Sequence, residues 1–592
     1  MTETPTITLT HHAMLVIWGA FARQMGLIEA LERVKIPQRT REHTPERKLT
    51  EFLVAILGGC EYLQDISHGS HPLDQDKAVA EAWGQSEWAD YSGVSRTLKA
   101  CTPETVAAIK GVLEEVSQPF IDQEVTLALS KQGVIIYDGD LTGRPVSNTS
   151  TSYEGAAFGW MSDEIRLGFQ LALVSMHSPT YGRLWLSGQH HPGDTVSTSQ
   201  AEALVQAAEV RTSVRPLRRT DLVQQHLAEQ QQHLHQAREA WTLRVEQAQT
   251  ALDESRRVEQ ELRLWQSRVT ALATASARPG QPIKPYSRLA KAKDKVRVYT
   301  ARLARRQQKV VAARRRIERE QERLQAHQQA VSVLQARLAQ FEADNRANPA
   351  PIRAIIRLDA GFGSAQNVTW LIEMGYDLYS KPTNQQVAQD LLNRVDEATA
   401  WTPVGPNAEL VTWSQQLLKH CPYPLNLALE RFYTGPTIRY STLLHYGADD
   451  VVSDPLAWFT FYNRRQLIEA GIKEGKSVFH LKHMPVHSVG GILIQELFAL
   501  FVANFVRWAA AWLNQADLNP GSPLTHHRPN VKALVRIAAN TSAWVVRQPD
   551  GGYLLSFTDA SCYCGLELVV PGSWHYQLPL KLFSCKSADF SP

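Results

Sequence analysis

A seven-residue repeat in the middle of the chain constrains its fold more than any other feature. Apolar side chains occupy every seventh position without a miss, at Leu289, Val296, Leu303, Val310, Ile317, Leu324, Val331 and Leu338. An earlier arm alternates steps of four and three residues, at Val258, Leu262, Trp265, Val269 and Leu272. Both patterns place one apolar stripe along a helix, and such a stripe is buried when two helices coil around each other. The turn-forming segment ARPGQPIKPYS separates two arms of about 55 residues, roughly 80 Å each. Residues 217–348 are therefore predicted to form an antiparallel coiled-coil hairpin.

The second arm of this hairpin is strongly basic. Between Gln281 and Glu320 there are fourteen Lys or Arg and three Asp or Glu, a local net charge of +11. The whole chain carries only +3 over 592 residues, so its average charge gives no information about nucleic acid. Two interpretations of the basic arm are open: a solvated coiled-coil surface, or a surface for nonspecific contact with phosphates.

Short helices are predicted for the first 130 residues. The segments HAMLVIWGAFARQMGLIEALERV and KLTEFLVAILGGCEYLQDI have helical periodicity, and CTPETVAAIKGVLEEVSQPF opens with Thr102 as an N-cap and Pro103 in the first turn. Four basic residues lie between the first two helices: Arg39, Arg41, Arg47 and Lys48. The region fits either a DNA-binding head or a plain helical domain.

Strand patterns begin at GVIIYDGDLTG, in which Val134, Ile136, Asp138 and Asp140 alternate onto one face. Two more strands (EIRLGFQLALVSM and GRLWLSG) and a helix (STSQAEALVQAAEV) precede the coiled coil. After it come a strand (PIRAIIRLD), a helix (AQNVTWLIEMG) and a strand (YDLYSK). This series predicts a mixed α/β sheet. A second insertion, residues 382–455, contains strand-like pieces such as TIRYSTLLHYG and is predicted to be a small β-rich subdomain.

Composition argues against several classes of protein. The chain opens without a charged-then-apolar leader, so secretion is not expected. The most apolar stretch, SVGGILIQELFALFVANFVRWAAAWL, is interrupted by Glu496, Asn504 and Arg507, which predicts a buried helix and no membrane span. The cysteines form no CxxC pair, which indicates a reduced cytosolic protein without structural zinc: Cys60, Cys101, Cys421, Cys562, Cys564 and Cys585. The spacing of three histidines suits a helix end or a turn better than a zinc site: His480, His483 and His487.

Three acidic positions fall at informative places in the predicted sheet. Asp138 or Asp140 lies on the first strand, Asp359 ends the fourth, and Glu469 follows the fifth. Carboxylate oxygens are the ligands that Mg²⁺ prefers. Two such ions about 3.5–4 Å apart activate a water or a 3′-hydroxyl and stabilise the leaving oxygen of a phosphoryl displacement. A single strand aspartate is usually a cap residue, but three acids in this order favour a metal site.

The segment YNRRQLIEAGIKEGK places four polar side chains at offsets 0, 3, 7 and 14: Tyr462, Arg465, Glu469 and Lys476. At about 100° per residue these positions share one narrow stripe of a helix, roughly 21 Å long. Ile468 and Ile472 fall on a neighbouring stripe, so the polar stripe is predicted to border a buried face. An ordinary amphipathic helix with solvated charges is the alternative.

These blocks resemble the DDE transposases of bacterial insertion sequences. The four residues above match the Tyr-x2-Arg-x3-Glu-x6-Lys signature of one branch at every spacing. RLDAGFGSAQNVTWLIEMGYDLYSK is similar to the second-aspartate block of that family, DLTG to its first-aspartate block, and GVSRTLKACT to its N-terminal helical region. Asp138 and Gly139 also resemble an Asp-Gly variant of the first block, so Asp138 stays open beside the preferred Asp140. The long hairpin is a departure, because it is not a standard part of the family.

The resemblance implies an RNase H-like catalytic core that cuts and joins DNA. Two Mg²⁺ ions, with Mn²⁺ as a substitute, would be held by Asp140, Asp359 and Glu469. The DNA backbone would be lined by Tyr462, Arg465 and Lys476. The implied partners are double-stranded DNA, both the terminal inverted repeats of the element and target DNA, and further copies of the chain in a homodimer or larger complex. The implied location is the bacterial cytoplasm, in association with the nucleoid and without membrane contact.

Some members of the family use a tryptophan of the β-rich insertion to hold a flipped base. Trp413 and Trp458 are the candidates here, although a core role is favoured for both. The expected divisions are an N-terminal helical DNA-binding domain (1–130), a catalytic core in three parts (131–216, 349–381 and 456–515), the coiled-coil hairpin (217–348), the β-rich insertion (382–455) and a C-terminal region (516–592). Two other functions stay open: a catalytically inactive or domesticated DNA-binding and tethering protein, and a host nuclease with the same fold.

Overall fold

The computed structural model describes residues 7–40, 42–161, 163–275, 284–515, 531–536, 538–558 and 567–570. Arg41, Cys562, Cys564 and Cys585 lie outside the described residues. The chain divides into two compact units: Arg218–Pro349, and Met1–Leu217 together with Ala350–Pro592. The first unit coincides, to within one residue at either end, with the predicted coiled-coil insertion.

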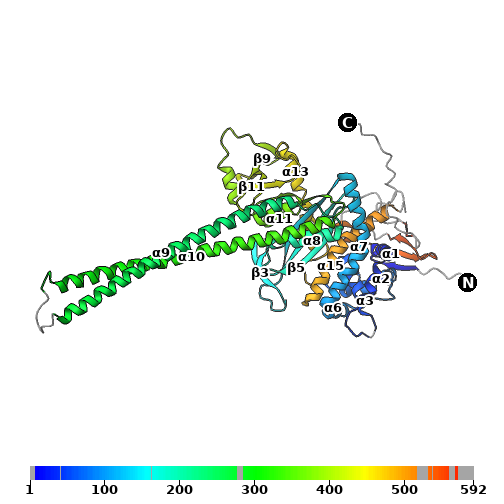
Figure 1. Ribbon diagram of the computed structural model, residues 1–592. Helices are drawn as coiled ribbons and strands as arrows, with labels where there is room; N and C mark the ends of the chain where they lie inside the picture. Colours follow the sequence, from blue (N-terminus) through cyan, green and yellow to red (C-terminus); the bar gives the residue numbers. More distant parts are fainter. Residues whose placement is uncertain are drawn as a thin grey trace. The chain divides into compact units, whose positions relative to one another are not determined.

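The smaller unit is a pair of long helices, α9 (Thr220–Ala275) and α10 (Arg288–Arg346), which lie side by side in Figure 1. Contacts between them pair low residue numbers on one helix with high numbers on the other, as in the ring contact of His233 with His327 and the ion pair of Glu254 with Arg306. This numbering defines an antiparallel pair and confirms the predicted pairing of two long helices.

The larger unit contains a mixed sheet whose central strands come from both sides of the hairpin. These strands are β2 (Val134–Pro145), β3 (Ala157–Met161), β4 (Glu164–Ser178), β5 (Gly182–Pro192), β6 (Arg353–Arg357) and β7 (Asp377–Ser380), with α11 (Ala365–Glu373) between the last two. β4 pairs antiparallel with β2 and β5, whereas β6 pairs in parallel with β2 and β7. The central order is therefore β5-β4-β2-β6-β7. Each predicted core strand is present, and the sequence patterns missed only the short β3.

Residues 382–455 are rich in strands, as predicted, but these strands continue the central sheet. The elements are α12 (Gln386–Leu392), β8 (Thr402–Gly405), β9 (Ala408–Gln416), β10 (Leu425–Thr434) and β11 (Thr437–Tyr446). β11 pairs antiparallel with β7, where Leu444 lies opposite Ser380, and the sheet then runs through β10 and β9 to β8. This pairing satisfies backbone groups that would otherwise be open along the edge of β7.

Alternate residues of β2 face opposite layers of helices, as the two-residue period of a strand requires. The hydroxyl of Tyr137 is 2.8 Å from that of Thr212 in α8 (Ala201–Thr212). Asp138 and Asp140 lie on the other face, toward α13 (Pro455–Asn463) and α14 (Gln466–Ser477). The candidate acids and the signature segment therefore share one side of the sheet.

The helices before β2 pack around α15 (Val489–Gln515). Of these, the helices that contact α15 are α1 (Ala13–Gln24), α3 (Pro45–Leu57), α6 (Tyr91–Ala100) and α7 (Pro103–Gln132). Three short helices, α2 (Leu27–Glu32), α4 (Asp65–His68) and α5 (Lys77–Ala82), pack against these four. Thr102 caps α7, as predicted, by accepting a hydrogen bond from the Thr105 amide. In the described part of the chain one helix is long and apolar enough to cross a membrane, over Val489–Leu513, and 78% of its most apolar window is buried inside the structure. This is the burial expected of a core helix in a soluble protein.

A small antiparallel sheet brings one N-terminal strand beside three C-terminal strands. The strands are β1 (Ile7–Thr10), β12 (Ala543–Arg547), β13 (Tyr553–Phe557) and β14 (Glu567–Val570), in the order β1-β12-β13-β14, and α17 (Val531–Arg536) precedes β12. No pattern in the sequence predicts this sheet. β1 is only four residues long, and its partner is remote in sequence, since Ile7 lies opposite Val546.

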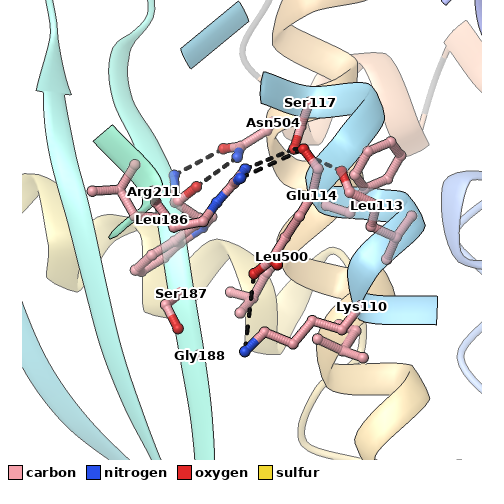
Figure 2. Close-up of a pocket in the computed structure, with 13 residues that line it drawn as sticks. Lys110, Leu113, Glu114, Ser117, Leu186, Ser187, Gly188, Arg211, Leu500 and Asn504 are labelled. Atoms are coloured by element: carbon pink, nitrogen blue, oxygen red, sulfur yellow. Dashed lines mark hydrogen bonds and ion pairs between the residues drawn. The ribbon is translucent and has the colours of Figure 1, made fainter. Parts of the chain in front are cut away.

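A cavity of about 60 Å³ marks the place where α7, α8, β5 and α15 meet (Figure 2). Arg211 of α8 donates hydrogen bonds to Ser117 at 2.8 Å and to Gln118 at 2.5 Å, both on α7. Asn504 of α15 bonds the backbone N–H and C=O of Trp185 in β5, each at 2.9 Å. The cavity therefore lies at a junction between helices and sheet, away from the candidate acids.

Candidate active site

The two aspartates of β2 have different surroundings. Asp138 lies opposite Arg357 of β6 and accepts two hydrogen bonds from its guanidinium, both at 2.7 Å. The two residues are 2% and 1% exposed, and Arg357 also donates to the carbonyl of Phe461 at 2.9 Å. Asp138 is therefore neutralised by a bidentate ion pair that ties β2, β6 and α13 together. Both of its carboxylate oxygens are occupied by this pairing.

Asp140 lies two residues further along the same face. One carboxylate oxygen accepts a hydrogen bond from the Leu141 amide at 2.8 Å, and the other accepts one from Arg465 at 3.1 Å. Burial raises the pKa of Asp140 to about 6; Arg465 opposes this rise, and the nearby Asp359 adds to it. A second carboxylate close by disfavours the charged form in this way. Asp140 is therefore the strand acid that interacts with the other candidate acids.

Asp359 follows β6 and begins the short turn of Ala360–Phe362. Its Oδ1 atom is buried without a hydrogen-bond partner. Burial is also the main cause that raises the pKa of Asp359, while Arg465 and the backbone amides of Gly361 and Phe362 oppose the shift. Buried polar atoms in native structures are usually satisfied, so this carboxylate oxygen has the capacity to accept one further contact.

The signature segment does not form the single helix that its spacing predicts. α13 ends at Asn463 and α14 begins at Gln466. At the joint the Arg465 amide donates to the carbonyl of Tyr462 at 3.0 Å, which is three residues back instead of four. The backbone is therefore tightened as in a 3₁₀ turn. The predicted straight stripe is broken after Tyr462.

Arg465 joins the candidate acids. Its guanidinium donates to Asp140 at 3.1 Å and to Glu469 at 2.8 Å. Arg465 is only 8% exposed, whereas the side chain of Glu469 keeps 43% exposure. Burial alone would lower the pKa of Arg465, but Asp140, Asp359 and Glu469 raise it above its ordinary value. Arg465 thus binds Asp140 and Glu469 directly, with Glu469 at the exposed side, and Asp359 lies near enough to act on its charge.

Tyr462 and Lys476 are more buried than expected for side chains that line a DNA backbone. Tyr462 is 5% exposed, and its hydroxyl donates to the carbonyl of Leu358 at 3.2 Å. This bond holds the end of β6 directly before Asp359, so Tyr462 is placed to position that acid and does not present its ring to a ligand. Lys476 is half-buried, and burial, with a smaller contribution from Arg144, lowers its pKa.

A buried arginine of β5 holds α14 in place, and no sequence pattern pointed to it. Arg183 lies against Gly471, where an added Cβ would come within 0.9 Å of its Nη1 atom. The same guanidinium donates to Glu474 at 3.2 Å, and Glu474 also accepts from Arg507 of α15 at 3.0 and 2.9 Å. Glycine at position 471 therefore allows the helix that carries Glu469 to approach the sheet closely.

A second buried network, also not predicted, links β2 to α15. Arg144 is fully buried and forms an ion pair with Glu496, which also accepts from His190 of β5 at 2.9 Å. Arg144 further donates to the carbonyl of Leu481 at 2.8 Å and to Gln495 at 2.6 Å. The acid that interrupts the apolar stretch of α15 thus has two basic partners. The signal in the sequence was that interruption, although its partners lie far away along the chain.

The residues present fit a divalent cation in their chemistry. Among the described residues, no group of three or more His, Cys, Asp or Glu is arranged to hold a metal ion as it stands. Arg465 lies between Asp140 and Glu469 and supplies positive charge there. Mg²⁺ needs only one or two protein carboxylates and takes its other ligands from water and phosphate. Asp140 and Asp359 could supply such oxygens, including the unpartnered Oδ1 of Asp359.

Other predicted candidates lie outside this cluster. Trp458 is 1% exposed and belongs to the core, and Trp413 is half-buried on β9. His480 lies in a turn, as predicted, with a positive φ of 51°. In the basic group near the N-terminus, Arg39 is exposed but Lys48 is buried at 7% exposure.

No protein-family model and no curated protein matches this chain.

Proposed function

We propose that this protein is a DDE transposase, an enzyme that cuts and joins DNA with Mg²⁺, or Mn²⁺ in its place. The observation that carries the proposal is that Arg465 binds both Asp140 from β2 and Glu469 from α14, while Asp359, from the end of β6, acts on the charge of Arg465 and Asp140. The strand order β5-β4-β2-β6-β7, with β4 antiparallel to its neighbours, supports an RNase H-like core. The signature spacing in the sequence is an independent argument for the same family.

In this mechanism each residue has a task that follows from its contacts. Mg²⁺, when bound, would activate a water or a 3′-hydroxyl and stabilise the leaving oxygen. Asp140 and Asp359 would bind it, and Glu469 would complete the site from the exposed side. Arg465 would then be free to hold a DNA phosphate with its planar guanidinium. Asp138 and Arg357 keep β2 and β6 in register, so that Asp140 and Asp359 stay together.

The proposed partners are the terminal inverted repeats of an insertion sequence and a target duplex, bound by a homodimer or larger complex in the bacterial cytoplasm, close to the nucleoid. Inverted repeats on either side of the gene, with a short target duplication outside them, would support a transposase. A host nuclease or a tethering protein needs neither. A tethering protein would also bind DNA without cutting it.

The test is Glu469→Gln, assayed on DNA that contains the ends of the element. The substitution keeps the size of the side chain but removes a negative oxygen ligand, so strand cleavage in Mg²⁺ should fall by orders of magnitude. A gel shift in Ca²⁺ should show end binding unchanged, since phosphate contacts dominate the affinity. Glu397→Gln, which changes an exposed acid, is the control and should cut normally. Cleavage by Glu469→Gln at the wild-type rate would remove Glu469 from the site.

A further inference from the structure

One flank of α10 carries a row of cations at regular seven-residue spacing. A Lys or Arg directly precedes each of the first six seam residues of the heptad repeat: Arg288, Lys295, Arg302, Lys309, Arg316 and Arg323. All six, called the cationic row below, are exposed. Residues seven apart lie in line along a coiled-coil helix, about 10.5 Å from one to the next and roughly 52 Å from first to last.

The cationic row is not used to pair the two helices. Residues that flank the seam of a coiled coil usually form salt bridges with the opposing flank. In the antiparallel register seen here, the opposing positions of α9 include only two acids, Glu254 and Glu261, and Glu254 pairs with Arg306. Within the described part of the chain, no salt bridge involves a member of the row.

The surroundings of the row add positive charge and no negative charge on the same flank. Lys291, Arg305 and Arg319 occupy the adjacent heptad position, and all three are exposed. The opposite flank carries fewer cations: at the matching heptad position, Lys293 and Arg314 are basic, whereas Thr300, Gln307 and Gln321 are neutral. The row therefore has a cation in every heptad from Arg288 to Arg323, whereas the opposite flank has one in only two of its five positions from 293 to 321.

We propose that the cationic row binds the phosphate backbone of double-stranded DNA. A duplex is a stiff polyanion with about one charge per 1.7 Å of axis, and roughly 52 Å corresponds to about 15 base pairs at 3.4 Å each. A straight, rigid row of charges matches such a ligand. A membrane surface fits less well, because the apolar side of α10 is directed into the helix pair, where Leu334 and Phe341 are buried at 4% exposure each. The identity of the bound DNA rests on the proposed function. The contact between the cationic row and the phosphate backbone does not depend on it.

The test measures how binding of the full-length protein to a nonspecific duplex depends on salt, without divalent ions. One variant replaces Lys295, Arg302, Lys309 and Arg316 with Gln. A matched control makes the same change in charge on α9, at four exposed arginines away from the row: Arg238, Arg256, Arg257 and Arg263. Each lost phosphate contact lowers the slope of log Kobs against log salt by about 0.9, so the row variant should lose about 3 to 4 and the control less than about 1.

Equal slopes for the two variants would overturn the proposal. The proposal would also be overturned if the row variant kept the wild-type salt slope for DNA but no longer bound phosphatidylserine vesicles. That result would assign the row to a membrane surface. Thermal melts of both variants establish that the helix pair is intact. Because this assay needs no cleavage, its result is separate from the Glu469→Gln test: a protein that cuts DNA but shows no row effect disproves this inference alone.

Discussion

At the scale of single residues, the role of each strand aspartate follows from its hydrogen-bond and ion-pair partners. Its position along the strand does not determine that role. Asp138 and Asp140 are two residues apart on one strand face, and both are buried. Asp138 is neutralised by Arg357, whereas Asp140 shares Arg465 with Glu469. The first acid is suited to hold strands together, and the second to meet a ligand.

These roles predict opposite effects on stability when each aspartate is changed to asparagine. Asp138→Asn leaves Arg357 buried without its counter-ion, which should lower the free energy of unfolding by about 3–5 kcal/mol.

The pKa of Asp140 is raised from 3.8 to about 6 in the folded protein. Its contribution to stability is therefore full below pH 3.8 and lost as the pH rises through about 6. Asp140→Asn cannot ionise, so it should be more stable than the wild type at pH 7.5, by up to about 3 kcal/mol.

Urea unfolding in EDTA at pH 4 and pH 7.5 measures both effects. The gain from Asp140→Asn should shrink toward pH 4, where Asp140 of the wild type is also largely protonated. Asp138→Asn should be destabilised at both pH values. An Asp138→Asn protein as stable as the wild type would show that the pair with Arg357 contributes little.

The sequence could not separate these two acids. A strand period places both on one face, and that expectation is correct. What distinguishes them is Arg357, which is 219 residues away along the chain. No local pattern reports such a pairing, and the same holds for the buried Arg144 and Glu496.

At the scale of elements, the glycines of α14 are explained by packing. By helix propensity, Gly471 and Gly475 only weaken the helix, by about 1 kcal/mol each. In the structure the bare backbone at Gly471 makes room for Arg183. A position that appears unfavourable in isolation therefore brings the helix with Glu469 close to the sheet.

Gly471→Ala should consequently misplace α14. The added methyl group would lie 0.9 Å from Arg183 Nη1, so either Arg183 or the helix must move. We expect DNA cleavage to fall at least about tenfold and the melting temperature to drop, while end binding changes little. Gly111→Ala is the matched control, because nothing lies within 4 Å of the new atom in α7. This control should stabilise the protein by about 0.5–1 kcal/mol.

A double-mutant cycle separates the Arg183 contact from a general loss of packing. If the clash with Arg183 is the cause, Gly471→Ala should cost less in an Arg183→Ala background than in the wild type. Additive losses would place the cause elsewhere. Cleavage that is unchanged in Gly471→Ala would show that α14 tolerates the shift.

Elements with a local signature were predictable, and those that depend on distant partners were not. The heptad repeat of α10 predicts a helix pair, because the residue at every seventh position is apolar over eight repeats. The break between α13 and α14 has no such signal, since the helical spacing continues through Arg464 and Arg465. β1 was missed because four residues are too few for a strand pattern and its partner lies near the other end of the chain.

At the scale of the whole molecule, the hairpin is inserted between two strands that are neighbours in the sheet. β2 and β6 pair in parallel although the hairpin separates them in sequence. Before and after the insertion the chain is held together, since the Ile352 amide donates to the carbonyl of Arg215 at 3.2 Å. At the base of the hairpin, Arg218 and Asn345 form two hydrogen bonds, at 2.8 and 2.9 Å. The insertion therefore starts and ends at nearly one point.

Replacing residues 218–349 with a short Gly/Ser linker should therefore leave the larger unit folded. Closing a short flexible loop costs little when its ends already lie close together, and the cost changes by only about 0.6 kcal/mol for each doubling of loop length. We expect the melting temperature of the larger unit to stay within a few degrees of its value in the full chain. The deletion also removes the six cations of the row, so the salt slope for a nonspecific duplex should fall by about 5. A melting transition that disappears with the hairpin would show that the sheet depends on it, and an unchanged slope would place the DNA contacts in the larger unit.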